Sequence, residues 1–194
     1  RHHRECLMAV QVVVMGVSGC GKSTLGRRLA QAFQARFVEG DDLHSVDNVD
    51  RMRAGIPLQD EDRWPWLERI GEERARAGKQ DSGVVVACSA LKKSYRDLLR
   101  RTAGPGLCFI HLRGERAALK ARMEARHDHY MPATLLDSQL ATLEPTDGED
   151  DVLALDFASP ADRLQAKAAA FLRQSANSII TDASLPVPAG SARQ

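Results

Sequence analysis

The stretch VQVVVMGVSGCGKS, residues 10–23, decides the fold. Its first half, residues 10–15, is apolar and rich in β-branched side chains, which is typical of a strand buried on both faces of a parallel sheet. Its second half, residues 16–23, matches G-x-x-x-x-G-K-[ST] at every fixed position. Leu25 and Leu29 then follow at helical spacing. The sequence therefore predicts a strand, a phosphate-binding loop and a helix in direct succession, and this context disfavours a chance glycine-rich turn.

The predicted loop has the chemistry to hold a nucleoside triphosphate. Glycines let backbone N–H groups turn inward around an anion, and the helix N-terminus adds a partial positive charge. Lys22 would neutralise the β- and γ-phosphates, and the Ser23 hydroxyl would ligate Mg²⁺. The predicted cofactors are thus ATP and Mg²⁺. The predicted nucleotide-binding residues of the loop are Gly16, Val17, Ser18, Gly19, Cys20, Gly21, Lys22, Ser23 and Thr24.

Composition and charge bound the class of protein. A chain of 194 residues with 43% hydrophobic and 27% charged residues fits one soluble domain. The net charge of +1 gives no field that would favour nucleic acid. No apolar run approaches the roughly 20 residues of a membrane span, and residues 1–9 lack the apolar core of a signal peptide. Cysteines at four scattered positions predict reduced thiols in a cytoplasmic protein, not a zinc site.

Apolar runs alternate with helical patterns along the chain, which predicts an α/β fold with right-handed crossovers in a parallel sheet. The expected strands are residues 10–15, 36–39, 84–88, 107–112 and 152–156. The expected helices are residues 22–34, 44–54, 60–77, 89–101, 115 onward, 132–143 and 159–175. We expect a loose lead-in over residues 1–9, a single P-loop domain over 10–176 and a flexible tail over 182–194.

Acidic residues follow the second expected strand. Glu39, Asp41 and Asp42 lie just past its carboxyl end, where ligands bind in open α/β sheets. One of these carboxylates can hold metal-bound water and another can accept a proton from a substrate hydroxyl. Capping of the next helix by Asp41 or Asp42 explains the pattern equally well. His44 adds little on its own.

Two further segments carry candidate ligands for a substrate. Arg63 follows three acidic residues and precedes Trp64 and Trp66, and its side chain could reach an anionic substrate. The two tryptophans are most simply explained as packing residues. Ser89 is expected at the end of the third strand and at the start of a helix. Three basic residues follow it, Lys92, Lys93 and Arg96. They could make this corner basic, or they could form a solvated helix face.

A polar break between two helical segments predicts a mobile lid over about residues 122–135. Such lids exclude water from a phosphoryl-transfer site. His127 and His129 flank an aspartate in this break, but their i, i+2 spacing is poor for ligands on one helical face, which disfavours a metal cluster.

Taken together, these motifs are similar to those of one family. The matching segments are residues 15–23, 39–44, 55–63, 65–67, 88–92, 95–96 and 129–131, with Asn48, Met52, Ser138, Gln139, Thr142, Leu143 and Glu144. From about residue 10 to 175 the chain resembles the gluconokinases, small P-loop sugar-acid kinases related in fold to shikimate and nucleoside monophosphate kinases. The family commonly has Phe where Tyr130 stands, and the segment beyond residue 176 has no counterpart.

The resemblance implies transfer of the ATP γ-phosphate to the 6-hydroxyl of D-gluconate, in a sheet of order 2-3-1-4-5 and in a homodimer. It implies Asp41 as base and substrate ligand, with Lys22 and Arg126 as the other catalytic residues. Ser23 and Glu39 would serve the Mg²⁺ ion, and Arg122 would contact the nucleotide. The implied gluconate ligands beside Asp41 are His44, Arg51, Arg63, Ser89 and Lys92.

The resemblance does not decide which basic residue binds the substrate carboxylate. It also leaves two rival readings: a shikimate- or nucleotide-type kinase, against which the Trp-containing segment and residues 88–92 argue, and a non-catalytic nucleotide-binding module. Asp41 and the lid arginines argue against the latter, because a module that only binds nucleotide needs no acceptor chemistry.

Overall fold

A five-stranded parallel sheet forms the centre of the molecule in the computed structural model, which describes residues 9–79, 82–125 and 133–183. The strands are β1 (Gln11–Met15), β2 (Arg36–Glu39), β3 (Val84–Ala87), β4 (Leu107–Arg113) and β5 (Val152–Asp156). Their order, β2-β3-β1-β4-β5, confirms the prediction. Val12 pairs with Val85 on one side and with Cys108 on the other, so β1 lies in the middle.

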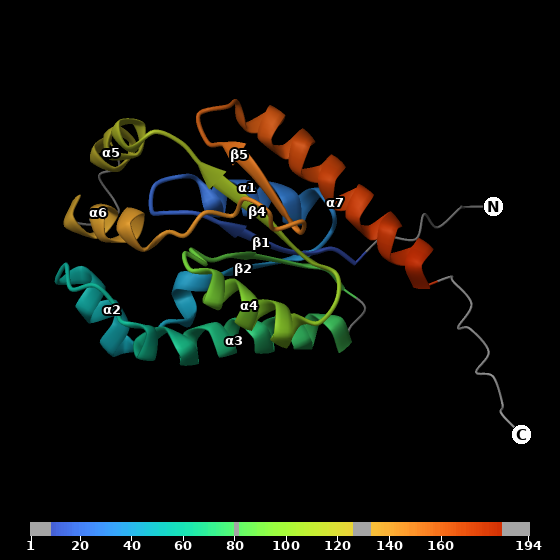
Figure 1. Ribbon diagram of the computed structural model, residues 1–194, viewed down its shortest axis with the longest axis horizontal. Helices are drawn as coiled ribbons and strands as arrows, with labels where there is room; N and C mark the ends of the chain where they lie inside the picture. Colours follow the sequence, from blue (N-terminus) through green and yellow to red (C-terminus); the bar gives the residue numbers. More distant parts are fainter. Residues whose placement is uncertain (1–8, 80–81, 126–132, 184–194) are drawn as a thin grey trace, which may run out of the picture.

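Helices cover both faces of the sheet (Figure 1). Helices α1 (Lys22–Ala32) and α7 (Ala161–Ala183) pack against each other on one face, and α3 (Asp60–Lys79) and α4 (Lys93–Ala103) do so on the other. This double cover explains why β1 and β3 are almost wholly apolar, because a strand covered on both faces has no solvated side.

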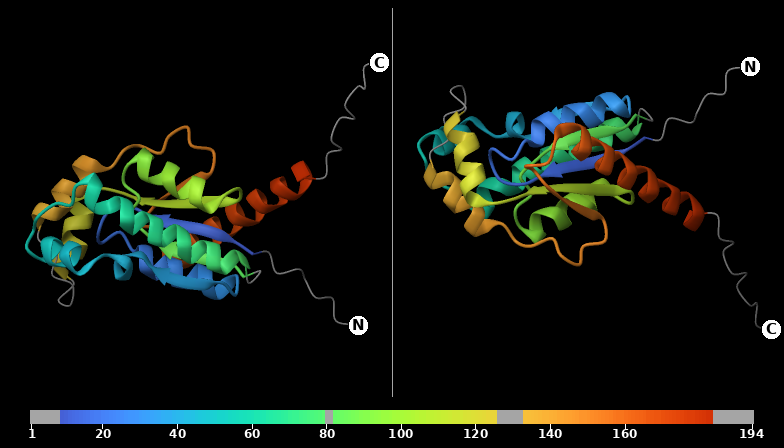
Figure 2. Two further views of the ribbon diagram at one scale, coloured as in Figure 1. Left: turned by 90° about the horizontal axis from the view of Figure 1, so that it is seen from below. Right: turned by 90° about the horizontal axis from the view of Figure 1, so that it is seen from above.

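The remaining helices gather at one end of the sheet, as the two further views confirm (Figure 2). They are α2 (Val46–Arg53), α5 (Arg116–Ala125) and α6 (Ala133–Thr142), and a short 3₁₀ helix, η1 (Gly40–Leu43), follows β2. This is the end at which β1 leads into the phosphate-binding loop. Ligands of open α/β sheets bind at such a carboxyl edge.

Two expected boundaries were wrong. Helix α7 continues to Ala183, well beyond the expected end at Ser175. The tail expected over residues 182–194 lies, apart from residues 182–183, outside the described part of the chain. Helix α4 begins at Lys93 rather than at Ser89, because residues 88–92 form a loop in which Ala90 has a φ of 45°. The lid predicted over residues 122–135 falls largely on residues 126–132, outside the described part of the chain. Among the helices that are described, none is long and apolar enough to cross a membrane.

Candidate active site

The loop between β1 and α1 has the backbone geometry of a phosphate cradle. Gly16, Gly19 and Gly21 have φ values of 140°, 82° and 96°, which side-chain-bearing residues rarely adopt. A Cβ atom at Gly16 would also collide with the carbonyl oxygen of Leu112 in β4. The Lys22 ammonium donates to the carbonyl oxygen of Val17, at 3.0 Å, and thus folds back over the loop. The structure therefore places the loop as the motif predicts.

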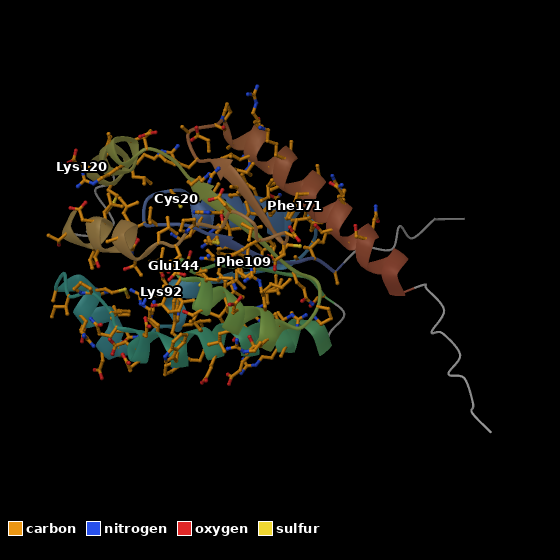
Figure 3. All side chains as sticks on the ribbon, viewed as in Figure 1. Cys20, Lys92, Phe109, Lys120, Glu144 and Phe171 are labelled. Atoms are coloured by element: carbon orange, nitrogen blue, oxygen red, sulfur yellow. The ribbon has the colours of Figure 1, made fainter. Side chains whose placement is uncertain are left out.

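A cavity of about 410 Å³ opens above this loop, and we call it the nucleotide pocket. Six of the nine predicted loop residues line it, namely Ser18, Gly19, Gly21, Lys22, Ser23 and Thr24, and Cys20 is buried. Glu39 and Met123 close its sides. Cys20, labelled in Figure 3, is 1% exposed and does not line the pocket, so its thiol is not available to a phosphate.

A second cavity of about 460 Å³ adjoins the first, and we call it the acceptor pocket. Its lining mixes polar and charged side chains with the apolar Val49, Met52, Leu91 and Leu135. Residues that line both pockets are Ser18, Lys22, Asp41 and Asp42. The two pockets therefore meet at a carboxylate pair and a lysine, where a phosphate held by the loop faces whatever occupies the acceptor pocket.

Asp41 stands on η1, and two neighbours fix the backbone that carries it. Gly40 lies so close to β3 that a Cβ atom there would collide with the carbonyl oxygen of Ala87. The indole N–H of the buried Trp66 donates to the Gly40 carbonyl oxygen at 2.7 Å. The Asp41 side chain itself is exposed to the pockets. Trp66, predicted only as a packing residue, thus also positions the candidate base.

His44 lines the acceptor pocket as a neutral ring. It stacks on Trp66 with ring centroids 4.1 Å apart, and its Nδ1 lies 3.4 Å from the Asn48 amide nitrogen. Burial lowers the pKa of His44 from 6.5 to about 4, and Arg63 lowers it further, although Asp41 acts in the opposite direction. A neutral imidazole at pH 7 can donate and accept hydrogen bonds from hydroxyl groups but adds no charge.

Arg63 is the most informative charged residue of the acceptor pocket. Its side chain is 9% exposed and lines the pocket, and its guanidinium lies 5.4 Å from the ring centroid of Tyr95. Within the described residues its Nε atom is buried without a hydrogen-bond partner. A buried guanidinium N–H without a hydrogen-bond partner is costly, so an anion that reaches Nε in this pocket would gain a charge-assisted hydrogen bond.

Lys92 is engaged by the protein itself. Its ammonium lies 2.9 Å from a carboxylate oxygen of Asp60, and the Tyr95 hydroxyl donates to the same carboxylate. The Tyr95 bond and then Lys92 lower the pKa of Asp60, so this carboxylate stays ionised. Lys92 does not line the acceptor pocket. The structure therefore places Lys92 beside the pocket, as part of the support of Arg63 and Tyr95.

The structure does not bring Arg51 to the acceptor pocket. Its guanidinium pairs with Asp62 at 2.8 Å on the outer side of α2. Arg53 of the same helix lines the pocket instead, and the sequence analysis missed it. A signal was present, because Arg53 follows Val49 and Met52 at i, i+3, i+4 spacing on one helical face.

Ser89 lines the acceptor pocket as predicted, but Arg96 is not part of a basic corner. The Arg96 guanidinium is fully buried, forms a bidentate pair with Glu149, and donates to the carbonyl oxygens of Ala90 and Leu91. It thereby holds the loop that carries Ser89. Breaking a buried pair of this kind strongly destabilises a fold, so Arg96 is a structural support of the pocket wall.

The residues predicted to serve Mg²⁺ lie together. The Ser23 hydroxyl donates to the Glu39 carboxylate, and both line the nucleotide pocket. Hydroxyl and carboxylate oxygens are ligands that Mg²⁺ prefers, with phosphate oxygens and water completing its coordination. The donor set therefore fits the predicted ion.

Of the two predicted lid arginines, only Arg122 is described. Its guanidinium lies 4.6 Å from the ring centroid of Phe157 and donates to the Phe157 carbonyl oxygen. It thus stands beside Gly21, between the phosphate-binding loop and the segment after β5. Arg126, His127 and His129 lie outside the described residues.

A second histidine, buried in the core beneath the site, has a lowered pKa. His111 of β4 is 3% exposed, pairs in register with Met15, and has its Nδ1 2.9 Å from the Thr146 hydroxyl. Burial lowers the pKa of His111 from 6.5 to about 4, and Arg113 and Arg96 lower it further. The unfolded chain therefore binds a proton at a higher pH than the folded chain does.

We expect the free energy of unfolding to fall as the pH drops from 6.5 towards 4, because the unfolded state then binds more protons. The contribution of one such histidine reaches about 1.4 kcal/mol per pH unit. His111→Gln, which cannot titrate, should show a shallower fall of the thermal midpoint over this range. Equal slopes for the variant and the unmodified protein would exclude His111 as a source of the acid sensitivity.

The chain is similar in sequence to proteins of known activity. A family model described as "AAA domain" matches residues 12–146. The thermosensitive gluconokinase of Escherichia coli is 44% identical over 146 residues, which are 75% of this chain and 78% of that protein. The gluconokinase of Arabidopsis thaliana is 42% identical over 71% of this chain and 79% of its own length.

Solved structures agree with these matches. A gluconokinase from Sinorhizobium meliloti superposes with a TM-score of 0.81 at 45% identity, covering 90% of this chain and 98% of that one. The Mycobacterium tuberculosis APS kinase CysC has a TM-score of 0.63 at 17% identity, over 85% of this chain and 98% of its own, and shares the fold alone.

Proposed function

Because this chain belongs to the gluconokinase family, we propose that it transfers the γ-phosphate of ATP to the 6-hydroxyl of D-gluconate, giving 6-phospho-D-gluconate and ADP. One observation in particular supports the proposal. The nucleotide pocket and the acceptor pocket meet at Asp41 and Lys22. Phosphoryl transfer needs this arrangement, since its catalysis consists of positioning and charge stabilisation.

The two pockets divide the work as follows. The backbone amides of residues 16–23 and the Lys22 ammonium hold the phosphates. In the acceptor pocket Asp41 accepts the proton of the attacking hydroxyl, and the neutral His44 and the Ser89 loop bind other hydroxyl groups. Ser23, with support from Glu39, would hold Mg²⁺, and the ion would neutralise phosphate charge there.

Arg63 is our candidate for the ligand of the gluconate carboxylate. It is buried, lines the acceptor pocket and has an Nε atom without a partner among the described residues. Arg53 reaches the same pocket and is the second candidate. Arg122 and Arg126 are proposed to stabilise the transferring charge and to contact the nucleotide from a lid over about residues 122–135, a role that rests on the family resemblance.

Arg63→Gln should raise the KM for gluconate by about 10- to 100-fold, because it removes a charge-assisted hydrogen bond from a buried site. The KM for ATP should change far less. Arg51→Gln is the matched control, since Arg51 pairs with Asp62 outside the pocket. Steady-state kinetics with each substrate varied in turn will decide. A larger effect of the Arg51 variant would contradict this assignment of the carboxylate ligand.

The proposed reaction is tested by an ADP-release assay with Mg·ATP and, in parallel, D-gluconate, shikimate or AMP. Turnover with gluconate alone is the expected result. Nucleotide binding without turnover of any acceptor would favour a binding module instead. A homodimer is proposed from the family resemblance, and light scattering of the purified protein tests it. A cytoplasmic location is proposed from the buried free thiols of Cys20, Cys88 and Cys108.

A further inference from the structure

A glutamine of α6 forms a hydrogen bond to the phosphate-binding loop. The side-chain carbonyl oxygen of Gln139 accepts a hydrogen bond from the backbone N–H of Ser18, at 2.7 Å. The amides of this loop are the groups that bind phosphate oxygens. An amide that already donates to a side chain cannot donate to a phosphate until that bond is broken. Gln139 therefore competes with the nucleotide for one donor of the loop.

Ser18 is also where the two pockets meet. It lines both of them, and Gln139 lines the acceptor pocket. A Gln139 side chain that leaves Ser18 stays within the acceptor pocket and can bond to hydroxyl groups there, because its amide carries both donors and an acceptor. The Gln139 side chain thus bonds to a loop amide and lies where it could also bond to an occupant of the acceptor pocket.

The backbone of Gln139 does not depend on its bond to Ser18. The residues after α6 are anchored to the acceptor pocket wall, where the Glu144 N–H donates to the Leu91 carbonyl oxygen at 2.8 Å and the Glu144 carboxylate accepts from the Lys93 N–H at 2.7 Å. Arg116 of α5 also pairs with Asp137 of α6. The backbone around Gln139 can therefore stay in place when its side chain reorients.

We propose that Gln139 is a positioning residue that couples the two substrates. It holds the Ser18 amide while the site is empty, and the arriving phosphate displaces it towards the acceptor. Nucleotide and acceptor then both favour the displaced state, so each tightens the binding of the other by the same factor. This inference rests on the proposed function for the identity of the acceptor but not for the competition at Ser18.

Two substitutions separate this role from a structural one. Gln139→Leu removes the competing oxygen and should bind a non-hydrolysable ATP analogue about 2- to 10-fold more tightly in the absence of acceptor, the range that one hydrogen bond supplies. Gln139→Glu keeps an acceptor for the Ser18 amide and adds a charge that repels phosphate, so its affinity should fall. A purely structural residue would lower the affinity in both variants.

The matched control is Gln165→Leu. Gln165 of α7 also joins two helices through its side-chain oxygen, which accepts from the Arg28 Nε at 2.8 Å, but it lines neither pocket. Its substitution should leave nucleotide affinity unchanged. Thermal midpoints of all variants show whether each is folded, and calorimetry with the Mg²⁺-bound analogue gives the affinities.

The coupling is measured by titrating D-gluconate with and without the analogue. We expect the analogue to tighten gluconate binding several-fold in the unmodified protein and to leave it nearly unchanged in Gln139→Leu. Equal coupling in both proteins, or weaker nucleotide binding by Gln139→Leu, would overturn the inference. Failure of the proposed function would show differently, as absence of turnover with gluconate in the unmodified protein, while the nucleotide-only titration still tests the competition.

Discussion

Asp41→Asn should lower kcat by about 10²- to 10⁴-fold, the usual contribution of a positioned general base, and should leave ATP affinity nearly unchanged. Asparagine has the shape of aspartate but cannot take the proton of the attacking hydroxyl. The backbone that carries residue 41 is held by Trp66 and by the close contact of Gly40 with β3, so the substitution leaves the site in place. Single-turnover kinetics with gluconate measure the effect.

Asp42→Asn is the control for this prediction. Asp42 also lines both pockets and is exposed, so it experiences similar surroundings. We expect the Asp42→Asn loss of kcat to be at least tenfold smaller than the Asp41→Asn loss. This corresponds to a difference of about 1.4 kcal/mol in activation free energy. If Asp42→Asn is the more damaging change, then the base is Asp42, and the assignment carried over from the family is wrong.

Lys22→Met should lower kcat/KM by about 10³-fold, comparable to the loss of one preorganised donor at a centre of developing charge. Methionine retains much of the length of lysine but cannot neutralise phosphate. In the structure the Lys22 ammonium already lies over the loop, 3.0 Å from the Val17 carbonyl oxygen, and lines both pockets. The ADP-release assay with the ATP concentration varied measures this loss of kcat/KM.

Lys93→Met provides the comparison for Lys22. Lys93 is exposed, pairs with Asp97 on its own helix and lines neither pocket. Its substitution should change kcat/KM by less than about twofold, since such surface pairs contribute little. Near-normal turnover of Lys22→Met would contradict the assignment of the phosphate-binding loop to the catalytic site.

Side chains in the acceptor pocket show where sequence reasoning stops. Arg51 and Arg53 lie two residues apart on α2, but one pairs outward with Asp62 and the other lines the pocket. Arg63 and Arg96 both come from segments that are rich in charge, yet Arg96 is neutralised by Glu149 and Arg63 keeps an Nε atom without a partner among the described residues. Composition alone treats these four arginines alike.

Features that depend on neighbouring residues were predictable from local patterns. Apolar runs and helical periods set the five strands in their order of appearance, and the glycines of residues 16–21 set a loop that only their backbone freedom permits. Lys22 and Ser23 follow that loop directly, so their place was fixed with it. Helix α7 was an exception, because its last turns carry no apolar signal strong enough to distinguish a helix from a tail.

Contacts between distant side chains became known only from the folded chain. Glu149 follows Arg96 by 53 residues, and Gln139 reaches Ser18 across 121 residues. Contacts of this kind depend on the direction in which each side chain leaves its element and on the closure of long segments, neither of which is written in local sequence patterns. The family of the protein was therefore visible in its motifs, whereas the junction of its two pockets and the contact of Gln139 with Ser18 were visible only in the folded chain.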